Sequence, residues 1–356
     1  MHAFATTDDF VDHVLSRFYD DMHTAQEDNY DWGRFSPDNV DRSQVFYTGF
    51  HIATLKALLR DSDAFMAAWR LLGDESSRQI FIDLLRYRLA GHQHVRLAIN
   101  TPAYWDLLRQ AAQTTTGPST LTVQGMFGAL AHYEFRFERN TLKLDCGVPW
   151  PLFLRQYFYE QDGVRVRPEK GDHVVDAGAG FGDTALAFGC AVGGEGCVYS
   201  FELLDSHLRV YEHNLAQNDV PARFQMFPCG LSDKIFIPSQ PCAETQHYDT
   251  GFALRPDNQD YPTTTLDHLV KTGAIQRVDF IKMDIEGSEL SALHGAVETL
   301  RRFRPRLAIS IYHDIAHFHA IPRFLAALDL GYRFHLAHYT IHAGETVLYA
   351  TAEPPP

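Results

Sequence analysis

Residues 173–188 read HVVDAGAGFGDTALAF, in which three glycines at alternate positions follow a short apolar run. The run at 173–176 is apolar and β-branched, which predicts a buried strand. Residues 183–188 place good helix formers behind a polar start, which predicts a helix. Glycine permits positive φ angles and removes side chains that would block a ligand, and a helix start offers unpaired N–H groups. The stretch therefore predicts a strand, a glycine turn and a helix at a nucleotide-type binding site.

The glycine spacing separates two classes of cofactor. The dinucleotide fingerprint G-x-G-x-x-G needs its third glycine where this chain has Asp183. Asp176 and Asp183 flank the turn, and two acids suit a cationic ligand better than a pyrophosphate. We therefore expect S-adenosylmethionine, which carries a sulfonium and an ammonium group. An NAD-dependent oxidoreductase and a glycine turn of an unrelated α/β protein are the alternatives.

The composition limits the partners. The chain has 356 residues, 45% hydrophobic and 21% charged, which suits one large domain or two. A formal net charge of −14 without a basic run argues against nucleic acid as a partner. The sequence has no run of eighteen apolar residues that would predict a membrane span, and the acidic N-terminal stretch is not typical of a signal peptide. Five cysteines without a C-x-x-C pair predict free thiols, so we expect a cytoplasmic protein.

Three regions follow one another along the chain. Residues 1–115 are predicted to be mainly helical, with Ser76 or Ser77 as the cap and Gly91 as the stop of one helix. Residues 116–170 are predicted to hold a β-hairpin around Arg139 and Asn140, with QTTTGPST at 113–120 as a linker. In residues 171–356 strands and helices alternate. That order predicts a doubly wound, mostly parallel α/β sheet, with the last two strands as an antiparallel hairpin.

Ligands of such sheets bind outside the carboxyl ends of the strands, so the residues that end the strands are site candidates. The first predicted strand ends at Asp176. The second ends at Glu202, whose carboxylate can accept hydrogen bonds from both hydroxyls of a ribose. Ser232 and Asp233 follow the third strand, where a polar side chain can meet an adenine amino group. Asp233 is equally consistent with an ordinary loop acid.

The fourth and fifth predicted strands carry the candidates for catalysis. DFIKMDIEGSEL at 279–290 brings Asp284, Glu286 and Glu289 to a strand end and a helix start. Capping of the helix start accounts for Glu289 and Glu286 better than for Asp284, which precedes the turn. The fifth strand ends at His313, which is either a site residue or an ordinary surface or core histidine.

At these residues the chain resembles the FkbM-type S-adenosylmethionine-dependent methyltransferases. The resemblance is carried by residues 171–188, 196–218, 279–296 and 309–350, and covers roughly residues 150–350. It implies the class I methyltransferase fold, which is Rossmann-like, and methylation of a hydroxyl group on a sugar, a glycan or a secondary metabolite. It also implies that Asp284 and Glu286 lie at the methyl-transfer edge. The expected cofactor contacts are Asp176, Gly178, Gly180, Phe181, Asp183, Thr184, Glu202, Leu203, Ser232, Asp233 and Asp284.

An alcohol is a poor nucleophile at neutral pH, so methyl transfer to a hydroxyl benefits from a base. His313 is the first candidate, because an unshifted imidazole titrates near pH 6.5, and Asp284 is the second. The acid cluster could instead hold Mg²⁺, but capping and binding of the cofactor ammonium use the same acids, so we expect no metal. We expect a small-molecule or glycan substrate and a homo-oligomer through the N-terminal helices. A non-catalytic S-adenosylmethionine-binding module is a further alternative.

Overall fold

The computed structural model describes residues 4–27, 29–31, 51–123, 129–238 and 261–352. Contacts divide the chain into two compact units. The first comprises residues 1–105 and 311–348, and the second comprises residues 106–310 and 349–356. The domain boundaries expected at residues 115 and 170 stay a prediction.

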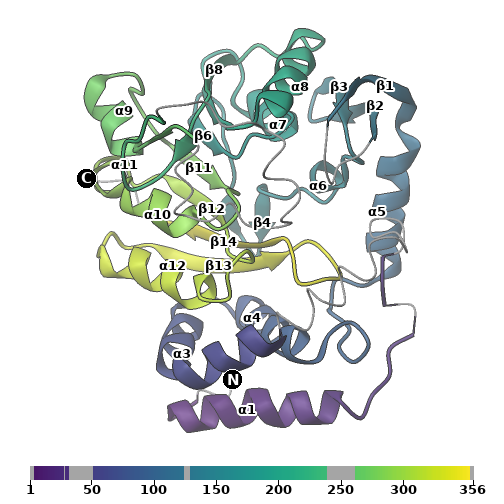
Figure 1. Ribbon diagram of the computed structural model, residues 1–356, viewed down its shortest axis with the longest axis vertical. Helices are drawn as coiled ribbons and strands as arrows, with labels where there is room; N and C mark the ends of the chain where they lie inside the picture. Colours follow the sequence, from purple (N-terminus) through teal and green to yellow (C-terminus); the bar gives the residue numbers. More distant parts are fainter. Residues whose placement is uncertain (1–3, 28, 32–50, 124–128, 239–260, 353–356) are drawn as a thin grey trace. The chain divides into compact units, whose positions relative to one another are not determined.

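The N-terminal part of the first unit is helical, as predicted (Figure 1). Phe10 and Val14 lie on one buried face of the first helix. The predicted cap of α4 (Glu75–Ala90) is wrong, because its N-cap is Asp74, whose carboxylate accepts a hydrogen bond from the Ser77 amide at 2.7 Å. The predicted stop at Gly91 is confirmed, with φ 79°. The elements of this unit are α1 (Thr7–Asp21), α3 (Ser62–Leu71), α4 (Glu75–Ala90), α12 (His317–Ala327) and β13 (Arg333–His338); α5 (Pro102–Gln113) crosses the boundary.

The second unit is built on five parallel strands. They belong to a seven-stranded sheet of order β13-β14-β12-β11-β6-β7-β8, which confirms the doubly wound, mostly parallel prediction. From β6 the chain moves outward through β7 and β8, and then returns to β11 on the other side. The carboxyl ends of β6 and β11 therefore form the topological switch point, where such sheets bind ligands. The strands are β6 (His173–Ala177), β7 (Cys197–Phe201), β8 (Arg223–Phe227), β11 (Phe280–Met283), β12 (Arg306–Ser310) and β14 (Thr346–Thr351).

Helices alternate with these strands as predicted, except that the helix at 266–272, between the third and fourth predicted strands, was not predicted. β6 and β7 are buried along their whole length. Full burial is expected of parallel strands that are covered on both faces. These helices are α7 (Asp183–Val192), α8 (Asp205–Ala216), α9 (Leu266–Thr272), α10 (Glu289–His294) and α11 (Val297–Phe303), with a short parallel pair β9 (Gly230–Leu231) and β10 (Thr263–Thr264) between β8 and α9.

A three-stranded antiparallel sheet precedes the parallel strands in the second unit. The predicted hairpin is confirmed, but the predicted linker is wrong, because its threonine-rich residues pair with the hairpin as a third strand. β-branched residues favour strands, and here they outweigh Gly117 and Pro118. Asn214 of α8 holds this sheet by accepting from the Asp145 amide and donating to its carbonyl. The elements are β1 (Thr115–Thr122), β2 (Ala129–Phe137) and β3 (Asn140–Cys146), followed by α6 (Trp150–Phe153), β4 (Tyr159–Gln161) and β5 (Val164–Val166).

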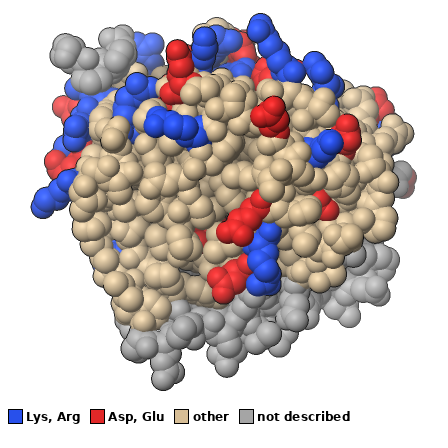
Figure 2. Space-filling model, turned by 90° about the horizontal axis from the view of Figure 1, so that it is seen from above, with Lys and Arg blue, Asp and Glu red and all other residues tan. Residues whose placement is uncertain are grey.

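The four cysteines in the described ranges are free thiols, as predicted, and Cys242 lies outside those ranges. Among the helices that the structure describes, none is long and apolar enough to cross a membrane. On the face drawn in Figure 2, acidic and basic side chains lie among one another.

Candidate functional site

The glycine turn after β6 needs glycine for two different reasons. Gly178 has φ 77°, and a Cβ atom there would lie 1.9 Å from the Asp284 carbonyl oxygen, so a side chain would push β6 and β11 apart. Gly182 is also closed, since a Cβ would lie 2.8 Å from Tyr211. At Gly180, with φ 51°, a Cβ would meet no atom of the described residues within 4 Å. Gly180 therefore faces open space, and of the three it is the glycine that leaves room for a ligand.

Glu202 follows β7 and lies against this turn. Its Oε2 accepts a hydrogen bond from the Gly180 amide at 2.9 Å, and its Oε1 accepts from the amides of Leu203 and Leu204 at 2.8 and 2.9 Å. Burial opposes ionisation of Glu202, but its interaction with His207 and with the two following amides holds its pKa below the ordinary value. The carboxylate is therefore an anion at neutral pH. A carboxylate offers about four acceptor positions, and the three amides fill all but about one of them. The contact of Glu202 with a ribose stays a prediction.

Asp176 is fully buried at the end of β6. Its Oδ2 accepts a hydrogen bond from the Thr184 hydroxyl at 2.8 Å, and the Lys282 ammonium lies 3.1 Å from its Oδ1. The structure thus turns Asp176 toward an internal ion pair, and its contact with a cofactor stays a prediction.

Lys282 is a residue to which the sequence analysis assigned no role. Its Nζ donates to the carbonyl oxygens of Ala177 and Gly178 at 3.1 and 2.6 Å, so it fastens the first residues of the glycine turn. Burial opposes its charge, but the carboxylates of Asp176 and Asp284 outweigh that cost and raise its pKa. The sequence does contain a signal for this ion pair. Lys282 lies within the apolar strand FIKM, and a buried lysine is expected to have a partner.

Asp284 directly follows β11 and is partly exposed. Its Oδ2 accepts a hydrogen bond from the Tyr157 hydroxyl at 2.6 Å, and Gln156 donates to the same hydroxyl at 3.1 Å. Tyr157 is 3% exposed, has φ 70°, and donates its amide to the Tyr349 hydroxyl at 3.0 Å. A tyrosine at positive φ is uncommon, and such conformations persist where the surroundings fix them. Tyr157 is therefore a second candidate site residue that was not named from the sequence.

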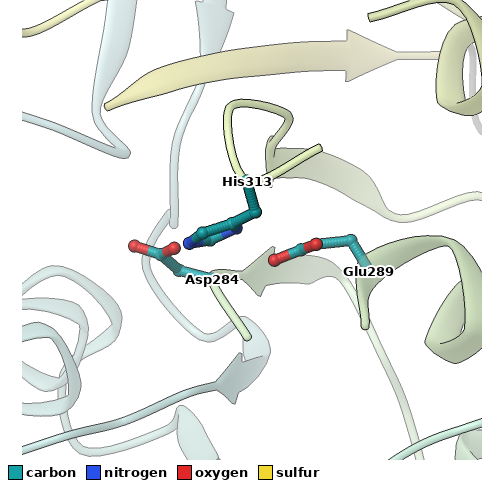
Figure 3. A group of neighbouring side chains, drawn as sticks. All are labelled: Asp284, Glu289 and His313. Carbon is teal, nitrogen blue, oxygen red and sulfur yellow. The ribbon is translucent and has the colours of Figure 1, made fainter. Parts of the chain in front are cut away.

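Figure 3 draws Asp284 and Glu289 together with His313. Glu289 begins α10, is fully buried, and accepts the Ile285 amide at 2.9 Å; its carboxylate lies within 4.8 Å of that of Asp284. This bond goes to an amide before the helix, so the capping role expected of Glu289 stays a prediction. His313 belongs to the first unit and follows the end of β12 by three residues, which can span at most about 10 Å. Its role as a base stays a prediction from its place in the sequence.

The other expected site residues lie in several settings. Glu286 is exposed, with φ 55°. Ser232 and Asp233 are joined to Ser291 of α10 through hydroxyl and carboxylate contacts of 3.1 to 3.2 Å. Asp183 begins α7, where burial raises its pKa. Phe181 and Thr184 are buried on the glycine turn and α7, and Leu203 lies beside Gly230. The turn, Glu202 and Asp284 therefore meet at the carboxyl ends of β6, β7 and β11.

The comparisons with known proteins agree with this geometry. Residues 176–334 match the family model described as methyltransferase FkbM domain. The structure is similar to that of methyltransferase FkbM from Methylobacillus flagellatus KT, with a TM-score of 0.52 and 19% identity over 83% of this chain and 60% of that chain. This chain thus spans less than two thirds of that protein. The likeness confirms the fold and, with the family model, the resemblance.

Two further solved structures are similar at lower scores. One is an O-methyltransferase from Bacillus cereus in complex with SAH, at 11% identity and TM-score 0.35, covering 51% of this chain and 75% of that chain. The other is O-methyltransferase TomG from Streptomyces achromogenes in complex with SAM, at 9% identity and TM-score 0.34, covering 51% and 73%. No curated protein matches the chain.

Proposed function

Residues 176–334 match the methyltransferase FkbM domain model, and from this match we propose that the protein transfers a methyl group from S-adenosylmethionine to a hydroxyl group of a sugar, a glycan or a secondary metabolite. The observation that carries the proposal is the position of Glu202. Its carboxylate accepts the Gly180 amide beyond the carboxyl end of the central strand, next to a glycine whose Cβ position is open among the described residues. An anion beside a turn without side chains fits a ribose that enters next to the backbone.

The residues present fit this cofactor in charge as well as in shape. When bound, S-adenosylmethionine supplies an activated methyl group, and the protein aligns the acceptor with it. Glu202 would face its ribose, and Asp284 would face its sulfonium group, which S-adenosylhomocysteine lacks. Asp284 is also placed to take up the proton that a hydroxyl group loses on methylation, while Tyr157 fixes the carboxylate through its 2.6 Å hydrogen bond. A proton acceptor that is held in one orientation is efficient in such a transfer.

The first test is binding of S-adenosylhomocysteine, measured by isothermal titration calorimetry. We expect the wild-type protein to bind it, and Gly180→Ala to weaken binding by at least about tenfold, because the methyl group enters the open side of the turn and each 1.4 kcal/mol is about one decade of affinity. Ala at φ 51° is strained by about 1–2 kcal/mol. Gly273→Ala, at φ 80° with open space around it, is therefore the matched control for strain without ligand contact.

Binding of NADH instead of S-adenosylhomocysteine would contradict the proposal and favour the oxidoreductase. Binding of S-adenosylhomocysteine without any methylated product in a mass-spectrometric screen of sugars, glycans and secondary metabolites would favour the non-catalytic module. The expected result is a mass gain of one methyl group on one class of hydroxyl compound. Oligomerisation through the N-terminal helices and a cytoplasmic location stay predictions.

We also propose that methyl transfer needs no metal ion. The carboxylate of Glu289 is already bonded to the Ile285 amide, and that of Asp284 to the Tyr157 hydroxyl. The two acids nearest the strand end thus have partners within the protein. We expect the transfer rate to stay within about twofold after dialysis against EDTA, since a lost metal Lewis acid would remove several kcal/mol of stabilisation. Recovery of a lost rate by added Mg²⁺ would overturn this part of the proposal.

A further inference from the structure

We propose that His207 is a positioning residue that holds Glu202 in the orientation required by the cofactor ribose. This inference rests on the proposed function, because it names the side chain that prepares the cofactor site. His207 lies in the first turn of α8 and is 9% exposed. Neither the motif around the glycine turn nor the strand-end acids draws attention to it in the sequence.

His207 contacts both halves of the ribose site with one ring. Its Nδ1 lies 3.6 Å from Oε2 of Glu202, the same oxygen that accepts the Gly180 amide. Its ring meets Phe181 edge-on, with centroids 4.8 Å apart and an angle of 69° between the planes. Phe181 stands between Gly180 and Gly182 on the turn. The histidine therefore packs against the turn on one side and the acid on the other.

The two carboxylate oxygens of Glu202 are held by different numbers of backbone amides. Oε1 is fixed by the amides of the two residues that follow Glu202, whereas Oε2 depends on Gly180 and on His207. Oε1 has both of its acceptor positions filled by amides, so a ribose hydroxyl would take the position that the Gly180 amide leaves open on Oε2. At 3.6 Å the imidazole is slightly beyond ordinary hydrogen-bond distance, so it leaves that position to the ribose while its ring limits movement of the carboxylate. His207 would thereby keep the carboxylate in place when the ribose binds.

The experiment is a double-mutant cycle on the full chain, with S-adenosylhomocysteine as the probe and its Kd as the readout. His207→Leu keeps an apolar side chain against Phe181 but removes the ring nitrogens. We expect it to weaken binding about tenfold, and to change binding by less than about twofold when Glu202 is already Gln, because a residue that acts through another loses its effect with it. His207→Gln, which keeps a polar group, is expected to recover part of the affinity.

His213→Leu is the matched control, because His213 lies on the same helix and contacts Asp145 at 3.2 Å instead of Glu202. It should leave the Kd unchanged, and thermal melting identifies any variant that fails to fold. His207→Leu with wild-type affinity, or with an equal loss in both backgrounds, would overturn this inference while leaving the proposed function intact. Wild-type protein that does not bind S-adenosylhomocysteine would overturn both.

Discussion

Lys282→Met should lower the free energy of unfolding by about 3–5 kcal/mol, the usual cost of removing one partner of a buried ion pair. Lys282 is 2% exposed and Asp176 is fully buried, so water cannot replace the lost ammonium group. The change leaves Asp176 with the Thr184 hydroxyl and removes the donor that the carbonyls of Ala177 and Gly178 share. Urea unfolding followed by circular dichroism measures the difference.

Two further variants distinguish the effect of losing the ion pair from the effect of changing the side chain. Lys271→Met, on the exposed side of α9, should change stability by less than about 0.5 kcal/mol, as surface substitutions do. The pair Lys282→Met with Asp176→Leu should recover a large part of the loss, because replacing both buried charges by apolar groups is often nearly neutral. A loss below about 1 kcal/mol for Lys282→Met, typical of an exposed pair, would show that Asp176 is not paired as the structure has it.

The ion pair also shows where prediction from this sequence ends. The strand, the glycine turn and the helix were predictable because their signals lie within sixteen neighbouring residues. The partner of Asp176 was not, because Lys282 is far along the chain and becomes its direct neighbour only through the parallel register of β6 and β11. That register pairs Lys282 with Asp176 and follows from the order of strands in the sheet. The sequence therefore predicts that Asp176 ends the strand, but it does not predict that the Asp176 side chain pairs with Lys282 inside the protein.

Tyr157 and the N-terminal cap of α4 went unpredicted for a similar reason. The hydrogen bond from Tyr157 to Asp284 joins residues 127 positions apart and depends on a backbone at φ 70° that no propensity favours. At the start of α4, Asp74 and Ser77 are both good capping residues. The structure chooses Asp74, whose carboxylate accepts both the amide and the hydroxyl of Ser77. The helix-capping preferences of the two residue types are too similar to decide between them.

Asp284→Asn should lower the rate of methyl transfer by about a hundredfold to ten-thousandfold, the usual worth of a positioned general base. The amide keeps the size of the side chain and can still accept from Tyr157, but it cannot take up a proton. Turnover is measured with excess S-adenosylmethionine and the acceptor found in the screen, and the Kd of S-adenosylhomocysteine is measured beside it. A fall in kcat with little change in that Kd is the signature of a group used in the transition state.

Glu286→Gln and His313→Ala complete the comparison at the same strand ends. Glu286 is exposed, so its substitution should change turnover by less than about threefold if Asp284 alone serves as the base. His313→Ala should cost on the order of a hundredfold if the imidazole is the base. Loss of turnover in His313→Ala together with normal turnover in Asp284→Asn would identify His313, and not Asp284, as the base. The amide of Asp284→Asn preserves the contact with Tyr157. That outcome would therefore mean that Asp284 and Tyr157 stabilise the structure at the strand end and take no part in proton transfer.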